Sequence, residues 1–148
     1  METKVMRFIT MVLRLGVGGL FVWAGVLKAL DPMAFLKSIE NYQILPHAVA
    51  LVAAFYLPYL EIFCGLGVIF KRLYAGALAI LGCLTLVFLA ALLSAWARGL
   101  DIDCGCFGLG DGKAHYGVAL ARDLALLAAI GFLEAVRNFR QSESHRNH

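Results

Sequence analysis

The sequence has 148 residues, of which 61% are hydrophobic and only 16% are charged, and its mean hydropathy is +0.81. Soluble domains carry about 45–50% apolar and about 25% charged residues, so this composition excludes an ordinary soluble domain. The net charge of +3 requires no nucleic acid partner, because the basic residues lie where membrane topology places them.

Four apolar segments account for most of the chain, and each reaches the roughly 20 residues that a helix needs to cross a bilayer. Residues 73–97 contain no charge, residues 8–27 and 48–70 contain one each, and residues 117–136 contain three. We therefore predict an all-α integral membrane protein, a single antiparallel four-helix bundle with short loops. Residues 137–148 are expected to form a polar cytoplasmic tail, of which "RQSESHRNH" at residues 140–148 is frayed.

The first segment also has to be distinguished from a cleaved signal peptide. Its apolar stretch is longer than the 7–15 residues of a signal peptide core, and no small-residue cleavage site follows before Asp31. We expect a retained helix. Glycines at residues 16–19 and small residues at 75–82 predict that helices approach closely there.

Basic residues predict how the helices are oriented. Both ends of the chain and the connection between the second and third spans carry unmatched bases: Lys4, Arg7, Lys71, Arg72, Arg137, Arg140 and Arg146. The connections at residues 31–47 and 98–115 balance bases with acids. Unmatched bases mark the cytoplasmic side, so both termini are predicted to be cytoplasmic. In a bacterial inner membrane, residues 98–115 then face the periplasm, where disulfides persist.

The first outward connection has a pattern of its own. Its apolar residues recur at helical spacing: Met33, Phe35, Leu36, Ile39 and Tyr42. This pattern predicts a short amphipathic helix that lies on the membrane surface or forms a lid over the bundle.

Charges inside the apolar segments are costly, and such residues usually face the bundle interior and pair. Arg14 and Glu61 are the expected partners, with Arg122 reaching toward them. One interpretation is a structural salt bridge between helices; the other is a polar site for a quinone headgroup or a proton path. Lys28 is expected to extend to the interface as an anchor, and Asp123 to pair with Arg122 or an outer lysine.

The strongest chemical candidate is the stretch "DCGCFG", in which Gly105 separates Cys104 from Cys106. A bent C-G-C can bring two Cα atoms within disulfide distance, and the small strained ring favours a reducible, redox-active bond over a structural one. Two alternatives stay open: a structural turn, and a metal site that adds His115 and Asp103 to the thiolates. The flanking acidic residues oppose thiolate formation.

The two remaining cysteines lie inside apolar segments. Cys64 and Cys83 are expected to pack as small apolar residues.

Four stretches resemble the MauE branch of the DoxX-like membrane proteins: "RLGVGGLFVWAGVLKALDP", "YQILP", "LPYLEIFCGLG" and "CGCFG". The resemblance spans nearly the whole chain. It implies a four-helix inner-membrane protein associated with periplasmic disulfide chemistry, as in maturation of the disulfide-rich subunit of methylamine dehydrogenase. It further implies a thioredoxin-like partner similar to MauD, and the wider DoxX group implies a quinone.

The resulting hypothesis is a thiol–disulfide redox protein. Cys104 and Cys106 exchange with a periplasmic thioredoxin-like protein through a mixed disulfide, and the bundle connects them to a quinone near Arg14, Glu61 and Arg122. The alternative is a non-enzymatic membrane assembly factor in which the C-G-C is a turn. A small-solute transporter is disfavoured because the chain is short.

Overall fold

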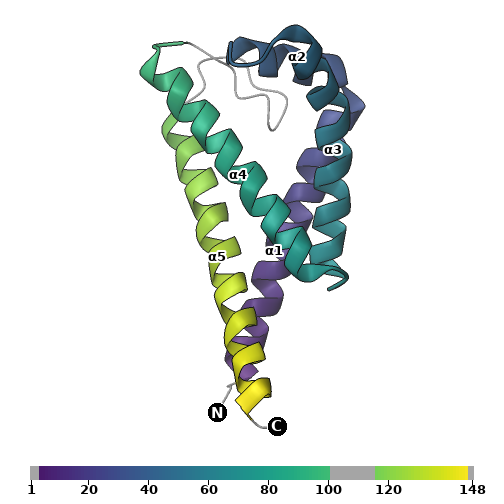
Figure 1. Ribbon diagram of the computed structural model, residues 1–148, viewed down its shortest axis with the longest axis vertical. Coiled ribbons are helices and arrows are strands. Elements are labelled where there is room, and N and C mark those ends of the chain that lie inside the picture. The colour runs from purple at the N-terminus through teal and green to yellow at the C-terminus, as the bar shows by residue number, and fades with distance from the viewer. Residues whose placement is uncertain (1–3, 101–115, 147–148) are drawn as a thin grey trace.

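The computed structural model describes residues 4–100 and 116–146, which form helices and the short turns between them (Figure 1). The helices are, in chain order, α1 Lys4–Leu30, α2 Pro32–Asn41, α3 His47–Ile69, α4 Tyr74–Ala97 and α5 Tyr116–Arg146. The start of α1 and the end of α5 lie together at one end of the molecule, here called the terminal end. Helix α2, the end of α4 and the start of α5 lie at the opposite end, the loop end.

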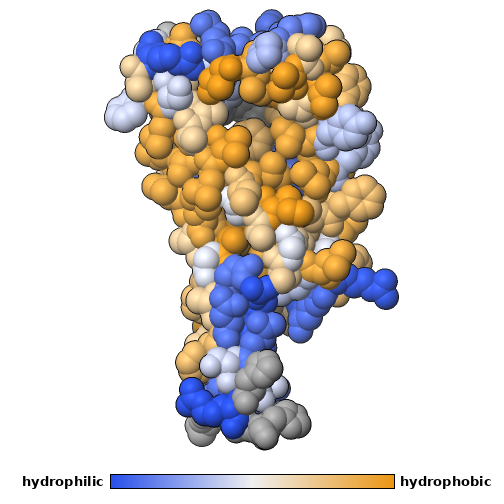
Figure 2. Space-filling view, viewed as in Figure 1, coloured by the Kyte–Doolittle hydropathy of each residue, from blue (hydrophilic) through white to orange (hydrophobic). Residues whose placement is uncertain are grey.

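Three of the described helices, α1, α3 and α4, are long and apolar enough to cross a membrane. Large apolar side chains cover the outside of the molecule; Trp23 is 61% exposed and Phe63 is 74% exposed. Figure 2 shows the result as a broad hydrophobic belt with hydrophilic side chains above and below it. A surface of this kind needs lipid around it. The chain is a multi-pass membrane protein, as its composition predicts.

Helix α5 differs from the other long helices. It packs along α4 and contacts α1, but its apolar first part contains Arg122, Asp123 and Glu134. The predicted frayed tail is wrong, because α5 continues as a helix through Arg146.

Glycines bring α1 and α3 into close contact. A Cβ atom added at Gly18 would lie 2.8 Å from the carbonyl oxygen of Gly65, and one added at Gly65 would lie 2.8 Å from the carbonyl oxygen of Gly18. Gly25 approaches the Pro58 carbonyl in the same way, at 2.7 Å. These distances leave no room for a methyl group, so the close approach predicted for residues 16–19 is confirmed. Gly82 in α4 is not constrained in this way, because its Cβ would make an ordinary 3.6 Å contact.

Helix α2 confirms the amphipathic helix predicted in the first connection. The Asp31 carboxylate accepts a hydrogen bond from the Ala34 amide at 3.0 Å, and Pro32 occupies the first turn, where its missing N–H costs nothing. Phe35 and Leu36 are buried against Ala50 and Ala54 of α3. The helix thus covers the loop end of α3, which favours the lid interpretation.

The connection between α2 and α3, residues 42–46, is held by contacts with residues of neighbouring helices. Arg98, just after α4, donates hydrogen bonds to the carbonyl oxygens of Tyr42 and Gln43. His47, at the start of α3, contacts the Glu40 carboxylate. Although the connection is short and exposed, these bonds tie it to α2, α3 and α4 together.

Candidate functional site

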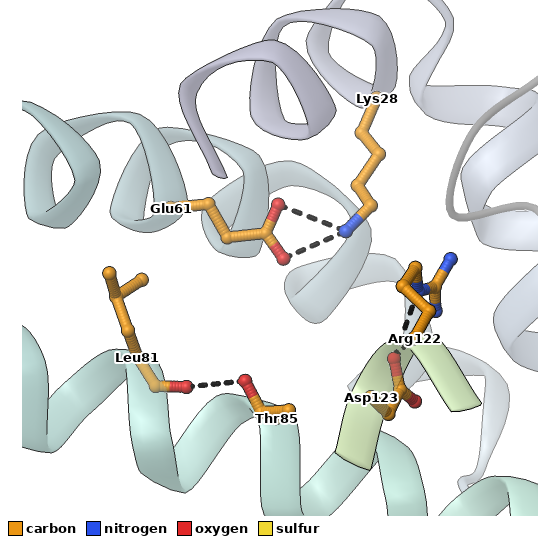
Figure 3. Close-up of polar contacts among 6 residues, drawn as sticks. All are labelled: Lys28, Glu61, Leu81, Thr85, Arg122 and Asp123. Atoms are coloured by element: carbon orange, nitrogen blue, oxygen red, sulfur yellow. Dashed lines mark hydrogen bonds and ion pairs between the residues drawn. The ribbon is translucent and has the colours of Figure 1, made fainter. Parts of the chain in front are cut away.

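The most buried charges of the described residues meet near the loop end. Lys28, in the last turn of α1, donates hydrogen bonds from Nζ to Oε1 of Glu61 at 2.7 Å and to Oε2 at 2.9 Å. The two side chains are only 4% and 1% exposed. Figure 3 shows them pointing toward each other from α1 and α3. Burial of both charges is tolerated because the ammonium and the carboxylate neutralise each other and are joined by two hydrogen bonds.

This pair overturns the expectation for Lys28. Lys28 is not an interface anchor, because Glu61 lies within reach inside the bundle. The signal was present in the sequence: Phe21, Ala24 and Lys28 follow a helical spacing, and all three are buried.

Aromatic rings enclose the same ammonium group. The Lys28 Nζ lies 5.0 Å from the centroid of the Phe35 ring and 4.9 Å from that of the Phe88 ring, within the range of cation–π attraction. One side chain of α1 therefore contacts α2, α3 and α4.

A second ion pair adjoins the first. Arg122 donates from Nε and Nη2 to Oδ1 of Asp123, at 3.0 and 2.8 Å, and Asp123 is buried. The Arg122 guanidinium is also close enough to Glu61 to act on it electrostatically. Thr85 Oγ1 donates to the Leu81 carbonyl at 2.8 Å, so its hydroxyl is satisfied within α4 (Figure 3). The structure thus brings Glu61 and Arg122 together, and the predicted pairing of Asp123 with Arg122 is confirmed.

The space within this polar cluster is small. A cavity of about 40 Å³ lies between the two ion pairs, lined by Lys28, Glu61, Thr85, Arg122 and Asp123 among others. Such a volume holds a few water molecules, whereas pockets for organic ligands are on the order of 300–1,000 Å³.

Arg14 lies elsewhere. It precedes Lys28 by fourteen residues, which places it about 21 Å away along α1. Its neighbours are at the terminal end, where it acts electrostatically on Tyr74 together with Glu134 and Arg137. The predicted Arg14–Glu61 pair is therefore wrong. Gly18 packs against Ile69, the last residue of α3, so Arg14 lies one turn beyond the end of that helix.

A larger cavity, of about 450 Å³, adjoins the polar cluster. It lies between α2, α3 and α4, and Phe35 and Phe88 contribute to its wall. Most of the lining is aliphatic or aromatic, with hydroxyl-bearing side chains at Ser38, Tyr42 and Ser94. Figure 2 shows the surface hollowed below the polar side chains of the loop end. Sequence patterns gave no indication of this cavity, because it depends on how far apart α2 and α4 lie.

The cysteines fall into two groups. Cys104 and Cys106 lie outside the described residues, as do Asp103 and His115; the described chain ends at Leu100 and resumes at Tyr116. Cys64 is buried in the core, as expected, while Cys83 is exposed on the outside of α4. Both are free thiols.

The fold and this site define a multi-pass α-helical membrane protein with an ion pair buried between α1 and α3. A family model described as "Methylamine utilisation protein MauE" matches residues 6–135. The chain belongs to the MauE family, as the resemblance of its motifs predicts.

A curated relative supports the assignment. Methylamine utilization protein MauE of Paracoccus denitrificans is 33% identical to this chain over 117 residues, which cover 78% of the chain and 63% of the relative. The chain therefore spans less than two thirds of the length of that relative. No solved structure matches the chain.

Proposed function

We propose that this protein supports the maturation of a disulfide-containing client, as in methylamine utilisation, by thiol–disulfide exchange at Cys104 and Cys106. Membership of the MauE family and the C-G-C sequence support this proposal. The structural observation that carries it is the position of the buried ion pairs. Lys28 lies in the last turn of α1, and Arg122 lies in the second turn of α5, the helix that follows the cysteine-containing segment (Figure 1).

The topology is part of the proposal. Helix α5 serves as the fourth span beside α4, with Arg122 and Asp123 turned into the bundle and paired with each other. Both termini are then cytoplasmic in a bacterial inner membrane, and residues 101–115 face the periplasm.

The exchange itself conserves thiols and disulfides. A thiolate of the thioredoxin-like partner attacks one sulfur of the Cys104–Cys106 disulfide and forms a mixed disulfide, which the second partner thiol resolves. Cys104 and Cys106 are left as thiols, and the partner is left oxidised for its client.

Regeneration of the pair requires an acceptor for two electrons and two protons. A quinone accepts both and becomes a quinol, and it dissolves in the membrane that surrounds the protein. We place Glu61 and Arg122 beside its site, through the polar cluster, and leave Arg14 out because of its distance.

Single variants Cys104→Ser and Cys106→Ser test the exchange step. When the partner is supplied in its disulfide form, the one remaining thiol attacks that bond, and one of the two variants is expected to trap the same mixed disulfide, visible on a non-reducing gel and lost on reduction. Cys83→Ser is the matched control, because that thiol lies on the outside of α4. If the double serine variant matures the client normally, and neither single variant traps a partner, the redox function is wrong.

The second candidate is a non-enzymatic assembly factor. It is favoured by the loop end itself, where α2 is firmly seated and exposes apolar side chains such as Met33. This function predicts that serine tolerates both cysteine positions, whereas substitution of Tyr42 or Phe107 abolishes complex formation.

A further inference from the structure

We infer that the terminal end binds the phosphate group of an anionic phospholipid, with Arg14 of α1 and Arg137 of α5 as hydrogen-bond donors. The site lies toward the opposite end of the molecule from the polar cluster, so it goes beyond the proposed redox function and does not depend on it (Figure 1). It also gives Arg14 a counter-charge, which Glu61 does not provide.

Two unpartnered arginine nitrogens identify the site. Among the buried side-chain nitrogen and oxygen atoms that the structure describes, Arg14 Nε and Arg137 Nε are those without a hydrogen-bond partner. A buried donor without a partner is rare and costly, so it indicates an acceptor from outside the described chain. The two arginines come from different helices, yet both act electrostatically on Tyr74, so one acceptor group can serve both.

The charges around Tyr74 are not balanced. Three arginines act on this side chain, Arg14, Arg137 and Arg140, and Glu134 is the acid that acts with them. Glu134 accepts from Arg137 Nη2 at 2.8 Å, so its charge is already shared within α5. At the loop end, by contrast, Lys28 and Arg122 each have an acid of their own. The terminal end therefore has an excess of positive charge among its described side chains, which favours an anion.

A phosphate suits these donors. The planar guanidinium group binds phosphate oxygens through charge-assisted hydrogen bonds, often two in parallel. Arg137 uses Nη2 for Glu134 and Asn138, and its Nε remains to donate to a further acceptor. The hydroxyl group of Tyr74 can donate a hydrogen bond to another phosphate oxygen.

The depth of the site favours a lipid headgroup as the source of the phosphate. Tyr74 is the first residue of α4, a helix long and apolar enough to cross the membrane, and Arg14 lies one turn beyond the end of α3. These helix ends mark the edge of the hydrophobic belt, where hydrophilic side chains begin in Figure 2. Arg14 is half-buried and Arg137 is 26% exposed, so a headgroup reaches both from the surface. Basic sites between membrane helices at this level bind anionic headgroups.

The test compares two lipids that share a phosphate and differ in net charge. Full-length protein in a neutral detergent is titrated with dioctanoyl phosphatidylglycerol, which is anionic, or dioctanoyl phosphatidylcholine, which is zwitterionic. Native mass spectrometry counts the bound lipid. We expect the anionic lipid to bind about fivefold or more tightly, and Arg14→Gln to remove that preference. Equal affinities of the unmodified chain for the two lipids would overturn the inference.

Arg72→Gln is the matched control. It removes the same charge from an exposed arginine in the turn between α3 and α4. The preference for the anionic lipid should persist in this variant. Equal losses in Arg14→Gln and Arg72→Gln would mean a general attraction of lipid to a basic surface, and the site would be wrong.

Glu134→Gln separates lipid binding from a structural role of the arginines. Removal of the acid should strengthen binding of the anionic lipid about fivefold, because Arg137 is then left without its counter-charge. Unchanged or weaker binding would count against the inference. If Arg14→Gln does not fold, Glu134→Gln decides.

Inorganic phosphate distinguishes the two sources of the anion. We expect it to displace the anionic lipid only at a much higher concentration, since it has no acyl chains in the bilayer or micelle. Displacement at an equal concentration would show a site for free phosphate, and the lipid assignment would be wrong.

Discussion

Lys28 of α1 and Glu61 of α3 form a two-bond ion pair that solvent hardly reaches. Among the described residues, each side chain is the hydrogen-bonded counter-charge of the other.

Removal of one member of this pair is expected to destabilise the protein strongly. Glu61→Leu leaves an uncompensated ammonium in the bundle, at a cost of about 3–5 kcal/mol. The double variant Lys28→Met/Glu61→Leu should recover most of that loss, because neither charge remains. Denaturant titration in detergent measures both. The exposed Lys37→Met is the control, and equal losses in the single and double variants would contradict the pairing.

Gly18→Ala should separate α1 from α3. The added methyl group would meet the Gly65 carbonyl oxygen at 2.8 Å. Neither atom can turn away, because the methyl carbon is bonded directly to the α1 backbone and the oxygen belongs to the α3 backbone. We expect a loss of about 1–3 kcal/mol of stability, as in overpacked cores. Gly19→Ala is the matched control because no atom lies within 4 Å of its added Cβ. It should be neutral or stabilising, since alanine favours a helix over glycine by about 1 kcal/mol. Thermal denaturation checks this prediction: the midpoint of Gly18→Ala should be lower than that of Gly19→Ala.

Asp31→Ala should loosen α2 locally. The Asp31 carboxylate accepts a hydrogen bond from the Ala34 amide. Loss of such a helix cap lowers the free energy of unfolding by about 1 kcal/mol. Amide hydrogen exchange is expected to accelerate in the first turn of α2, while α3 keeps its protection. Asp31→Ser, which retains a capping oxygen, should exchange at nearly the original rate. Faster exchange in both variants alike would argue against the cap.

The membrane-embedded cysteines should differ in reactivity. In a Cys104→Ser/Cys106→Ser background in detergent, a small maleimide is expected to modify the exposed Cys83 under native conditions. The buried Cys64 should react only after denaturation. Mass spectrometry of peptides separates the two sites, and rapid labelling of Cys64 in the folded protein would contradict the packing.

Much of the fold could be predicted from the sequence. Segment length and apolarity placed α1, α3 and α4 correctly, and periodicity identified α2. These features depend on local composition. The polar residues after residue 136 predict a tail, whereas they continue α5 as a helix through Arg146.

The site was predicted only in part. Glu61 and Arg122 were selected correctly as neighbours, since buried charges have few partners. Arg14 does not pair with Glu61, although both are charges inside apolar segments, because the two residues lie at different levels of the bundle. Gly18 contacts Ile69, the last residue of α3, so α1 extends beyond α3 at the terminal end. Arg14 lies on that extension and is therefore beyond the reach of Glu61. The pairing of Lys28 with Glu61 was not predicted, because a lysine near the end of a membrane helix usually extends its ammonium group to the aqueous interface.

The glycine contacts also determine how far apart the helices stand. Backbone atoms of α1 and α3 meet at Gly18, Gly25 and Gly65, and the side chains of Val22, Ile62 and Ile69 pack against these glycines. Gly67 of α3 faces α4 in a similar way, because a Cβ atom added there would lie 3.3 Å from the Ala77 Cβ atom. A larger side chain at any of these glycines has to push two helices apart, so the spacing of the bundle is set by positions that carry no side chain.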